Sequence, residues 1–347
     1  MTRIGLIIGS GTGPELADVF KQSMDRISRL VGKPVEIVEC EHQFHSYYQT
    51  AGWTPARIEA AVKDDVRRLE AFYQAHYGNG GRAIFRTAFN AETLYRFRAI
   101  GKAVKTVYIA LQEKRLLLIR DETQGFYVND SYHVDEREIR FCGSFSLAGF
   151  QTITEYSLGE AERVLKKDYD IWVLYKHHLF ANVLESWTHK LLDRAKIYQP
   201  NQATDLLLSY LEGNSNADLL LITGNEVGDI LHEVLIHTLE LGTRNSLCSK
   251  NIYLHEDYRG LVEYQTVHGS ADDIAGQGLV NPVATLRAAA ALVEDQLSHE
   301  GFSALMGAAI KSAERAGMIG PDAGGRSSTS EIVEAVLARA EADFRSV

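Results

Sequence analysis

One segment of the chain, residues 267–282, carries an unusual density of side chains that can bind a ligand. It contains three glycines, which free the backbone, and the hydrogen-bonding side chains of His268 and Asn281. An irregular loop of this kind can wrap around a planar, polyhydroxylated ligand. A plain surface loop does not need this combination, so the sequence predicts a binding loop directly before a helix.

Two carboxylates, Asp229 and Glu233, are spaced for joint action on one cation. Four positions separate them within an expected helix, so both lie on one face about one turn apart. Hard divalent cations such as Mg²⁺ and Mn²⁺ prefer oxygen ligands. The same spacing is also typical of a solvated helix surface, and the pair alone does not decide between the two interpretations.

A glycine-rich turn follows the first expected strand. Residues 9–15 have the sequence GSGTGPE, and glycines at a strand-to-helix turn allow the backbone to approach a phosphate closely. The spacing is not GxGxxG, and plain turn geometry explains the glycines as well. Both interpretations stay open at this point.

The elements that must position these residues alternate between strands and helices. Short apolar runs, expected as strands covered on both faces, occupy residues 4–8, 116–119, 171–174 and 219–222. Helical periodicity covers residues 15–30, 55–76, 158–167 and 282–296, and a last helix is expected to begin near Ser328 or Thr329 with Glu331 in its first turn. This alternation predicts an α/β protein with a largely parallel sheet.

Composition narrows the class of protein. A length of 347 residues suggests about two domains, and 45 % hydrophobic with 24 % charged residues excludes wholesale disorder. A net charge of −10, with no basic face, argues against nucleic acid as a partner. No apolar run is long enough for a membrane span and no cleavable signal pattern is seen, so we expect a cytoplasmic protein without a membrane partner. The three cysteines show no CxxC spacing and are expected to be reduced, buried thiols.

The motifs together resemble the isocitrate and isopropylmalate dehydrogenase family, the metal-dependent β-decarboxylating dehydrogenases. Residues 267–282 are similar to the family's NAD-binding loop, and residues 9–15 resemble its opening GDGIGPE. Three further segments match in the family's chain order: residues 120–127 (RDETQGFY, against RENTEGEY), 223–231 (TGNEVGDIL, against TGNxFGDIL) and 324–331 (GGRSSTSE, against GGTASTSE). Residues 40–110 match weakly.

The resemblance implies an isopropylmalate dehydrogenase-like α/β fold. A large α/β domain is built from both chain ends, residues 1–90 and 248–347, and binds the nucleotide. A smaller central α/β domain, residues 91–247, holds the dimer interface and the metal and substrate residues. The resemblance also implies a homodimer in which each active site lies in the cleft and takes residues from both subunits.

In the family, carboxylates bind a divalent cation that polarises the substrate. The resemblance assigns metal ligation to Asp229, to Glu233 in place of an aspartate, and to Asp205 from the partner subunit. Tyr127 occupies the position of the family's proton-transfer tyrosine. The partner lysine expected just before Ala181 is replaced by Phe180, which cannot transfer a proton.

Other residues would have to supply the function of that lysine. Lys176, His177 or His178 reach the same space if the preceding loop is reshaped, and His178 has a suitable ordinary pKa near 6.5. A polar strand end with no catalytic role explains these three residues equally well.

The substrate carboxylates are held by arginines in the family. Arg120 matches one of them, and a guanidinium binds a carboxylate through two hydrogen bonds. The remaining arginine segment is rewritten and offers Arg96 and Arg98, with Lys102 and Lys105 nearby. We therefore expect a substrate that differs from both isocitrate and isopropylmalate.

The resemblance also assigns the nucleotide. Asp273 and Ile274 stand where NADP-preferring members carry Lys-Tyr, and a carboxylate there would bind ribose hydroxyls but repel a 2′-phosphate. NAD is the expected cofactor. The residues expected to contact it are His268, Gly269, Ser270, Ala271, Asp273, Ile274 and Asn281.

Two functions follow as hypotheses. The first is an NAD-dependent and Mg²⁺- or Mn²⁺-dependent oxidation, with decarboxylation, of a small 2-hydroxy acid that bears a second carboxylate. The second is a non-catalytic or regulatory homologue that binds nucleotide or acid without turnover, which the loss of the lysine would fit.

Overall fold

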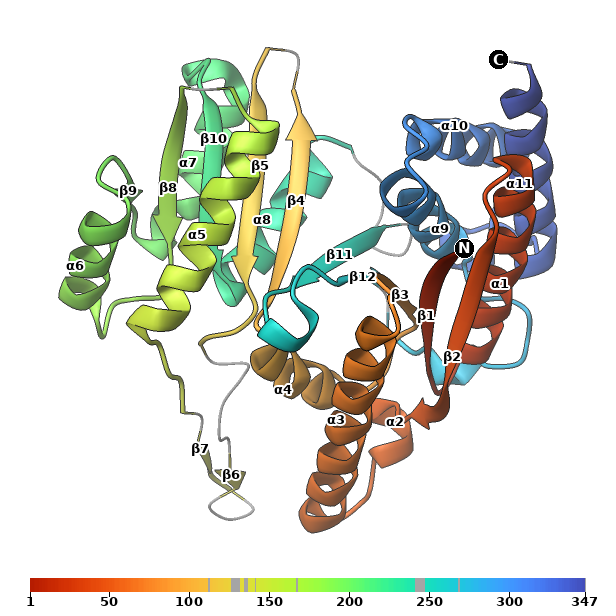
Figure 1. Cartoon of the computed structure of the whole chain (residues 1–347), viewed down its shortest axis with the longest axis horizontal. Helices are drawn as coiled ribbons and strands as arrows, with labels where there is room; N and C mark the ends of the chain where they lie inside the picture. The colour runs from red at the N-terminus through yellow and green to blue at the C-terminus, as the bar shows by residue number, and fades with distance from the viewer. Residues whose placement is uncertain are drawn as a thin grey trace. The chain divides into compact units, whose positions relative to one another are not determined.

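The structure, a computed structural model, describes residues 1–111, 113–125, 132–133, 137–140, 142–166, 168–240, 247–267 and 269–346. The chain divides into two compact units (Figure 1). Unit 1 contains residues 1–94, 242–250 and 256–347, and unit 2 contains residues 95–241 and 251–255. The domain boundaries near residues 90 and 248 stay a prediction.

The strands of the described chain belong to one mixed sheet of ten strands and one small hairpin. The order in the large sheet is β2-β1-β3-β12-β11-β4-β5-β10-β8-β9. Both neighbours of β4 run antiparallel to it. Parallel pairing joins β1 to β2 and β3, β3 to β12, and β10 to β5 and β8. The expected α/β class is confirmed, and the expected parallel character holds away from β4.

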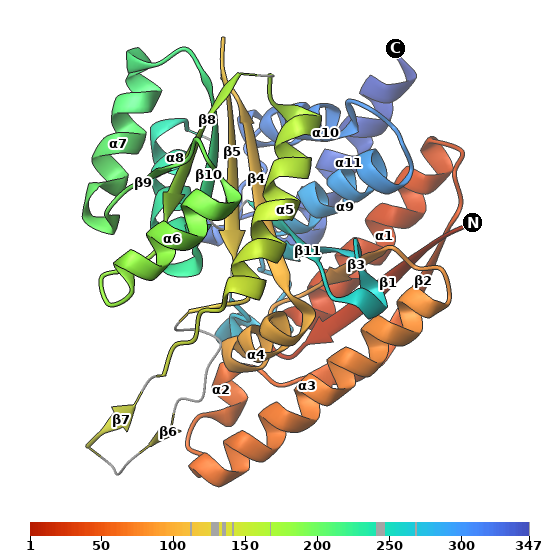
Figure 2. The ribbon, with the colours of Figure 1, turned by 60° about the vertical axis from the view of Figure 1, so that its left-hand side comes forward.

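Unit 1 is built on four parallel strands. These are β1 (Thr2–Gly9), β2 (Val35–Phe44), β3 (Ala83–Arg86) and β12 (Val262–Thr266). Its helices are α1 (Gly13–Leu30), α2 (Tyr47–Thr50), α3 (Pro55–Gly78), α9 (Val283–Gln296), α10 (Phe302–Arg315) and α11 (Thr329–Arg345). The long helix α3 runs beside β2 (Figure 2).

The core of unit 1 forms where α1 and α9 cover the strands. Phe20 of α1 stacks on Phe85 of β3 with ring centroids 4.1 Å apart, and both rings are fully buried. The small side chains of α9, Ala288 to Ala291, let that helix pack closely in the same cluster. Burial of this apolar surface fixes the carboxyl ends of β1 and β3, from which the loops described below depart.

Unit 2 contains the strands β4 (Ala103–Ala110), β5 (Arg115–Asp121), β8 (Tyr169–Leu174), β9 (Lys196–Ile197) and β10 (Asp218–Gly224), with the end of β11 (Cys248–Tyr253). Its helices are the main part of α4 (Ala91–Gly101), α5 (Leu147–Val164), α6 (Ala181–Leu191), α7 (Ala203–Ser209) and α8 (Asn225–Thr238). A small hairpin pairs β6 (Tyr132–His133) with β7 (Ile139–Arg140).

Short turns of 3-10 and π helix complete both units. In unit 1, 3-10 turns occupy residues 256–258, 272–274 and 321–323. In unit 2, a 3-10 turn occupies residues 200–202 and a π turn occupies residues 210–214.

The two faces of the unit 2 strands carry different helices. Alternate residues of β10, such as Leu220 and Ile222, pack with the α5 and α6 side, whereas Leu219 and Leu221 pack with α7 and α8. Figure 1 shows α5 in front of these strands with α7 and α8 behind them. Strands covered on both faces explain the uniformly apolar runs in the sequence.

Two local expectations are wrong. A helix was expected over residues 158–167, but α5 covers Leu147–Val164 and begins at Ser146, whose hydroxyl accepts a hydrogen bond from the amide of Gly149. The expectation of buried thiols also fails, because Cys142 is exposed and Cys40 and Cys248 are only partly buried, although all three are free. The last helix begins as expected, with a capping box between Ser328 and Glu331.

Among the described helices, none has the length and apolar character that crossing a membrane requires.

Candidate functional site

Unit 1 contains a cavity of about 750 Å³ beside the predicted binding loop. Six residues expected to contact the cofactor line it: Gly269, Ser270, Ala271, Asp273, Ile274 and Asn281. The sequence did not predict its other walls, formed by Tyr47, Tyr48, Phe89, Ala91, Leu279, Val280, Pro321 and Asp322. His268 lies outside the described residues. The cavity is large enough for a nucleotide-sized ligand.

The glycine-rich turn after β1 braces this loop. The amide and the hydroxyl of Thr12 both donate to the carbonyl oxygen of Ser270, at 2.8 and 2.9 Å. Gly11 has a φ of +71°, and a Cβ atom there would lie 2.4 Å from that same oxygen. The turn therefore contacts the loop so closely that only glycine fits, which accounts for Gly11 without a bound phosphate.

A second set of hydrogen bonds holds the loop from within unit 1. Ser270 and Ser46 donate to the two carboxylate oxygens of Asp272, each at 2.6 Å. The side chain of Asn281 donates to Asp322 at 2.8 Å. Ala271 adopts a left-handed conformation with a φ of +43°. The loop is thus fixed by contacts that are far apart in sequence, as a preformed binding site requires.

The composition of the walls suits an adenosine-like group. Tyr47 and Tyr48 are exposed aromatic side chains at one wall, and aromatic faces stack on planar rings. Asp273 is exposed, so its carboxylate is available to accept hydrogen bonds from a ligand. The cavity can therefore combine an apolar surface for a base with an anionic acceptor for hydroxyl groups.

Unit 2 contains a buried cluster of charged side chains. Nη2 of Arg120 lies 3.1 Å from a carboxylate oxygen of Glu122, and Arg98 forms a close ion pair with the other oxygen. Lys105 lies 3.8 Å from Glu122. Arg120 and Glu122 are each only 1 % exposed. Three basic side chains thus lie around one buried carboxylate.

The cluster extends to the helix that carries the predicted metal ligands. The same Nη2 of Arg120 lies 2.6 Å from Oδ1 of Asp229 and donates to the side-chain oxygen of Asn225 at 2.5 Å. The side chain of Asp229 is 43 % exposed. Gly228 permits this approach, because a Cβ atom there would lie 2.4 Å from Cγ of Arg120. A buried guanidinium and a partly exposed carboxylate therefore lie side by side.

Lys105 is the residue whose ionisation this cluster changes most clearly. Burial of the ammonium group, together with the nearby charge of Arg120, lowers the pKa of Lys105 to about 7 from its ordinary 10.5, although Glu122 acts in the opposite direction. The strand register places Lys105 directly across from Arg120. The amine can therefore exist in both protonation states near neutral pH.

Comparison with known proteins then decides the family. A family model described as isocitrate/isopropylmalate dehydrogenase matches residues 3–336. The chain belongs to the isocitrate/isopropylmalate dehydrogenase family. The predicted resemblance is confirmed, and the family is one of β-decarboxylating dehydrogenases.

The relatives within this family are distant. The chain is 32 % identical over 238 residues to a 3-isopropylmalate dehydrogenase of Novosphingobium aromaticivorans, a match that spans 65 % of this chain and 64 % of that protein. It is 24 % identical over 366 residues to the 3-isopropylmalate dehydrogenase of Streptococcus pneumoniae, spanning 97 % and 99 % of the two chains. The fold matches isocitrate dehydrogenase from Methylococcus capsulatus with a TM-score of 0.65 at 18 % identity, covering 98 % of this chain and 100 % of that one.

Within this member of the isocitrate/isopropylmalate dehydrogenase family, the predicted metal carboxylates lie on two helices. Asp229 and Glu233 are on α8, one turn apart, and both are partly exposed. Asp205 is exposed on α7. Across the described residues of one chain, these three do not form a group of mutually close ligand atoms. The assignment of Asp205 to the site of a partner subunit stays a prediction.

The segment where the sequence predicts the loss of the family's lysine is held by apolar packing. The Phe180 ring lies 4.5 Å from that of Phe145 and packs against the unit 2 core. His177 is buried and its Nδ1 lies 2.6 Å from the carbonyl oxygen of Tyr175, so a structural role accounts for it. Lys176 and His178 are exposed. Phe180 is thus integrated into the fold, whereas Lys176 and His178 lie at the surface.

The remaining predicted site residues are Tyr127 and the arginines of α4. Tyr127 lies outside the described residues. Arg96 is partly exposed on α4, and Arg98, two residues further along, is the arginine that reaches the buried cluster. The roles of Lys105 and Glu122 in that cluster could not be predicted from spacing, although Glu122 stands where the family's motif has an uncharged asparagine.

Proposed function

We propose that this chain is an NAD-dependent and Mg²⁺- or Mn²⁺-dependent dehydrogenase that oxidises, and decarboxylates, a 2-hydroxy acid with a second carboxylate. The contact between Arg120 and Asp229 carries the proposal. A 2-hydroxy acid presents a carboxylate for a guanidinium and a hydroxyl for a metal ion within a few ångströms of each other. The neighbouring guanidinium and carboxylate match that pair of groups.

The metal would be held by carboxylates alone. Asp229 is partly exposed and Glu233 follows one helical turn later, so two hard oxygen donors face the same side of α8. Asp205 of a partner subunit would add a third. A bound divalent cation would lower the pKa of the substrate hydroxyl and polarise the resulting ketone.

Side chains of the protein would orient the substrate and transfer protons. Arg120, with Arg98 and Arg96, would orient the substrate carboxylates. Tyr127 would hold the proton that the enol intermediate needs after decarboxylation, and Lys176 or His178 would accept the hydroxyl proton in place of the missing lysine. The shared site requires a homodimer, which we propose as the active form.

NAD is proposed as the electron acceptor because of Asp273. Its exposed carboxylate borders the cavity of unit 1 and would accept hydrogen bonds from the adenosine ribose hydroxyls. The negative charge would repel the 2′-phosphate of NADP. His268, Gly269, Ser270, Ala271, Ile274 and Asn281 would complete the contacts to the nucleotide.

The test is a coupled assay of the purified protein with NAD, Mn²⁺ and a panel of malate derivatives and isocitrate analogues. Formation of NADH and release of CO₂ with at least one acid, each dependent on Mn²⁺, is the expected result. An absence of NADH with every acid, under conditions where the protein is folded and dimeric, would refute the catalytic proposal.

One observation favours a non-catalytic homologue as the second candidate. Glu122 already neutralises part of the charge on Arg98 and Arg120, so these arginines are satisfied without a substrate. A regulatory subunit that binds nucleotide or acid would need no free arginine pair. Binding of NAD by calorimetry without turnover of any acid would support this alternative.

A further inference from the structure

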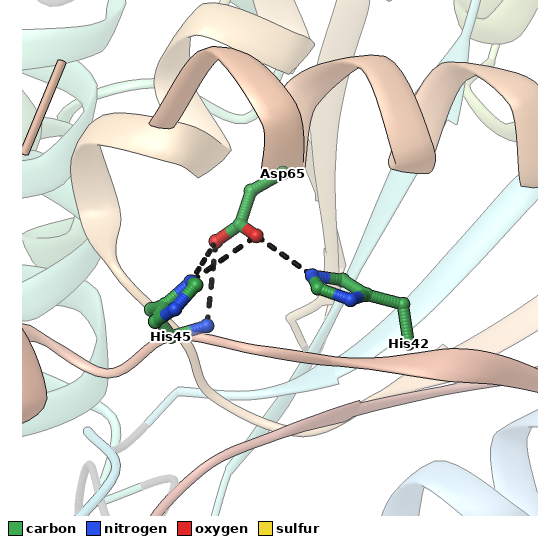
Figure 3. Close-up of side chains that lie close together, drawn as sticks. All are labelled: His42, His45 and Asp65. Atoms are coloured by element: carbon green, nitrogen blue, oxygen red, sulfur yellow. Dashed lines mark hydrogen bonds and ion pairs between the residues drawn. The ribbon is translucent and has the colours of Figure 1, made fainter. Parts of the chain in front are cut away.

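A second group of metal-binding side chains lies in unit 1, away from the residues discussed above. His42 is on β2, His45 follows the end of that strand, and Asp65 is on α3 (Figure 3). Nε2 of His42 lies 2.8 Å from Oδ1 of Asp65, and Nδ1 of His45 lies 3.0 Å from Oδ2. Within the described ranges, these three residues form the one group of three potential ligand atoms that all lie within 4.8 Å of one another.

The burial of Asp65 makes this group different from a surface contact. Its side chain is 1 % exposed, and its ion pairs in the described part of the chain go only to the two histidines. The arginines of the same helix turn are engaged elsewhere, since Arg67 and Arg68 pair with Asp64. A buried carboxylate is costly without a compensating positive charge. A bound cation would supply such a charge.

The two histidine side chains pack against aromatic rings but remain partly exposed to solvent. Their side chains are 22 % and 32 % exposed. The ring of His42 packs edge-on against Phe44 at 4.7 Å, and the ring of His45 packs edge-on against Trp53 at 5.6 Å. Figure 3 shows both imidazoles pointing at the carboxylate from the strand side, with Asp65 approaching from the helix. A small ion can therefore enter from solvent and meet three preformed ligands.

We propose that His42, His45 and Asp65 bind a divalent transition-metal ion of the Zn²⁺ type. Two imidazole nitrogens and one carboxylate oxygen suit Zn²⁺, Co²⁺ or Ni²⁺ and are a poor match for Mg²⁺. Tetrahedral binding with bonds of about 2.0–2.1 Å separates the ligand atoms by about 3.4 Å, so a small outward movement of the rings accommodates the ion. Water completes the coordination.

The position of the site connects it to the cavity of unit 1. The residue after His45 is Ser46, whose hydroxyl donates to Asp272 of the binding loop at 2.6 Å. The next two residues, Tyr47 and Tyr48, line the cavity. The carbonyl oxygen of His45 also accepts a hydrogen bond from the amide of Asn90 at 2.8 Å. An ion that fixes His45 would therefore stiffen the chain where it reaches the cavity wall, and it should raise the melting temperature of the protein.

The experiment is a calorimetric titration of the full chain, freed of metal with a chelator, using Zn²⁺ alone. His42→Asn, His45→Asn and Asp65→Asn are compared with the exposed control His189→Asn and with Asp229→Asn, which lacks the proposed catalytic ligand. We expect affinity for one Zn²⁺ to fall at least tenfold in both histidine variants and to persist in His189→Asn and Asp229→Asn. The histidine variants keep the proposal testable if Asp65→Asn does not fold.

Titration with Co²⁺ provides an independent readout. Visible d–d absorption of tetrahedral Co²⁺ is expected in the parent protein and in Asp229→Asn, and it should disappear in His45→Asn. Zn²⁺ affinity that is unchanged in both histidine variants, or that is lost only in Asp229→Asn, would overturn the proposal. Because the site is judged by binding and not by turnover, the result is independent of whether the proposed dehydrogenase activity is found.

Discussion

Nη2 of Arg120 lies 2.6 Å from Oδ1 of Asp229, and the same nitrogen lies 3.1 Å from Glu122. One guanidinium thus joins a buried carboxylate to a partly exposed one. Asp229 faces solvent enough to bind an ion, whereas Glu122 does not. The difference separates a carboxylate suited to ligand binding from one that balances internal charge.

Replacing Asp229 by Asn should remove a metal ligand and preserve the shape of the side chain. We expect Mn²⁺ affinity to fall at least tenfold and metal-dependent turnover to disappear, because the variant lacks one ligand charge. Calorimetry with Mn²⁺ in the presence of substrate is the measurement. The exposed Asp168→Asn variant is the matched control, and equal Mn²⁺ affinity in all three proteins would contradict the assignment.

Glu122→Gln should destabilise the protein and make it responsive to anions. Removing the carboxylate takes away the buried negative charge that Arg98, Lys105 and Arg120 share, which should lower the free energy of unfolding by about 3 kcal/mol. Added dicarboxylic acid should recover part of this loss in the variant and less in the parent. Urea unfolding with and without malate measures both effects.

The pair between the exposed Arg163 and the partly exposed Glu160 supplies the control for that experiment. Glu160→Gln should change the free energy of unfolding by less than about 1 kcal/mol, because exposed ion pairs contribute little. If Glu122→Gln and Glu160→Gln have the same free energy of unfolding, the ion pairs of the buried cluster do not stabilise the protein as we expect.

The lowered pKa of Lys105 predicts a pH dependence of stability. Between about 7 and the ordinary 10.5, the unfolded chain holds a proton on this amine that the folded chain has released. The unfolded state binds more protons in that window, so the stability of the parent should rise with pH there, by up to about 1.4 kcal/mol per unit. The Lys105→Met variant has no amine at this position and should not show this contribution to the pH dependence of stability.

The comparison of the parent with Lys105→Met isolates the lysine from other titrating groups. Urea unfolding at several pH values from 6 to 9.5 should show the parent gaining stability relative to the variant as pH increases above 7. Two curves that remain parallel over the whole range would show that the amine keeps its ordinary pKa.

Cofactor choice can be redirected at two positions. Asp273→Lys combined with Ile274→Tyr should shift the ratio of kcat/KM for NAD and NADP by roughly tenfold or more toward NADP, because a cation replaces the repelling carboxylate. Steady-state kinetics with both nucleotides measures this ratio. Glu300→Lys adds the same charge at another exposed position and should leave the ratio unchanged. A parent protein that already prefers NADP would contradict our interpretation of the loop.

The brace between Gly11 and the binding loop can be tested with two glycine variants. In Gly11→Ala, a Cβ atom would lie 2.4 Å from the carbonyl oxygen of Ser270, so we expect a loss of about 1–3 kcal/mol in stability and weaker NAD binding. Gly32 has a similar φ of +66° but no atom within 4 Å of its Cβ position. Gly32→Ala should therefore cost about 1 kcal/mol from backbone strain alone and leave NAD affinity unchanged.

The sequence predicted features that depend on neighbouring residues better than those that depend on distant ones. The strands β5 and β10 were visible because burial on both faces produces uniform apolar runs. The binding loop was visible because its special residues lie within one short segment. Helix α5 was placed too late in the chain, since its start depends on the cap at Ser146 and its buried face on Phe150 and Ile153.

The charged cluster and the histidine pair illustrate the opposite case. Arg98, Lys105 and Arg120 come from a helix and two strands, and only the register of β4 against β5 brings the last two together. Asp65 is 20 residues from His45 in sequence and meets it because α3 packs on β2. No local pattern encodes such distances, so these contacts could be found only from the fold.

The strand register that places Lys105 opposite Arg120 also affects the order in which substitutions at these positions can be tolerated. Like charges directly across an antiparallel pair destabilise a sheet unless a counter-charge is present. Replacing Glu122 first would remove the carboxylate that Lys105 and Arg120 share, whereas replacing Lys105 first would remove one of the two like charges. The effect of a substitution at Lys105 on stability therefore depends on whether Glu122 is still present, which makes these two positions epistatic.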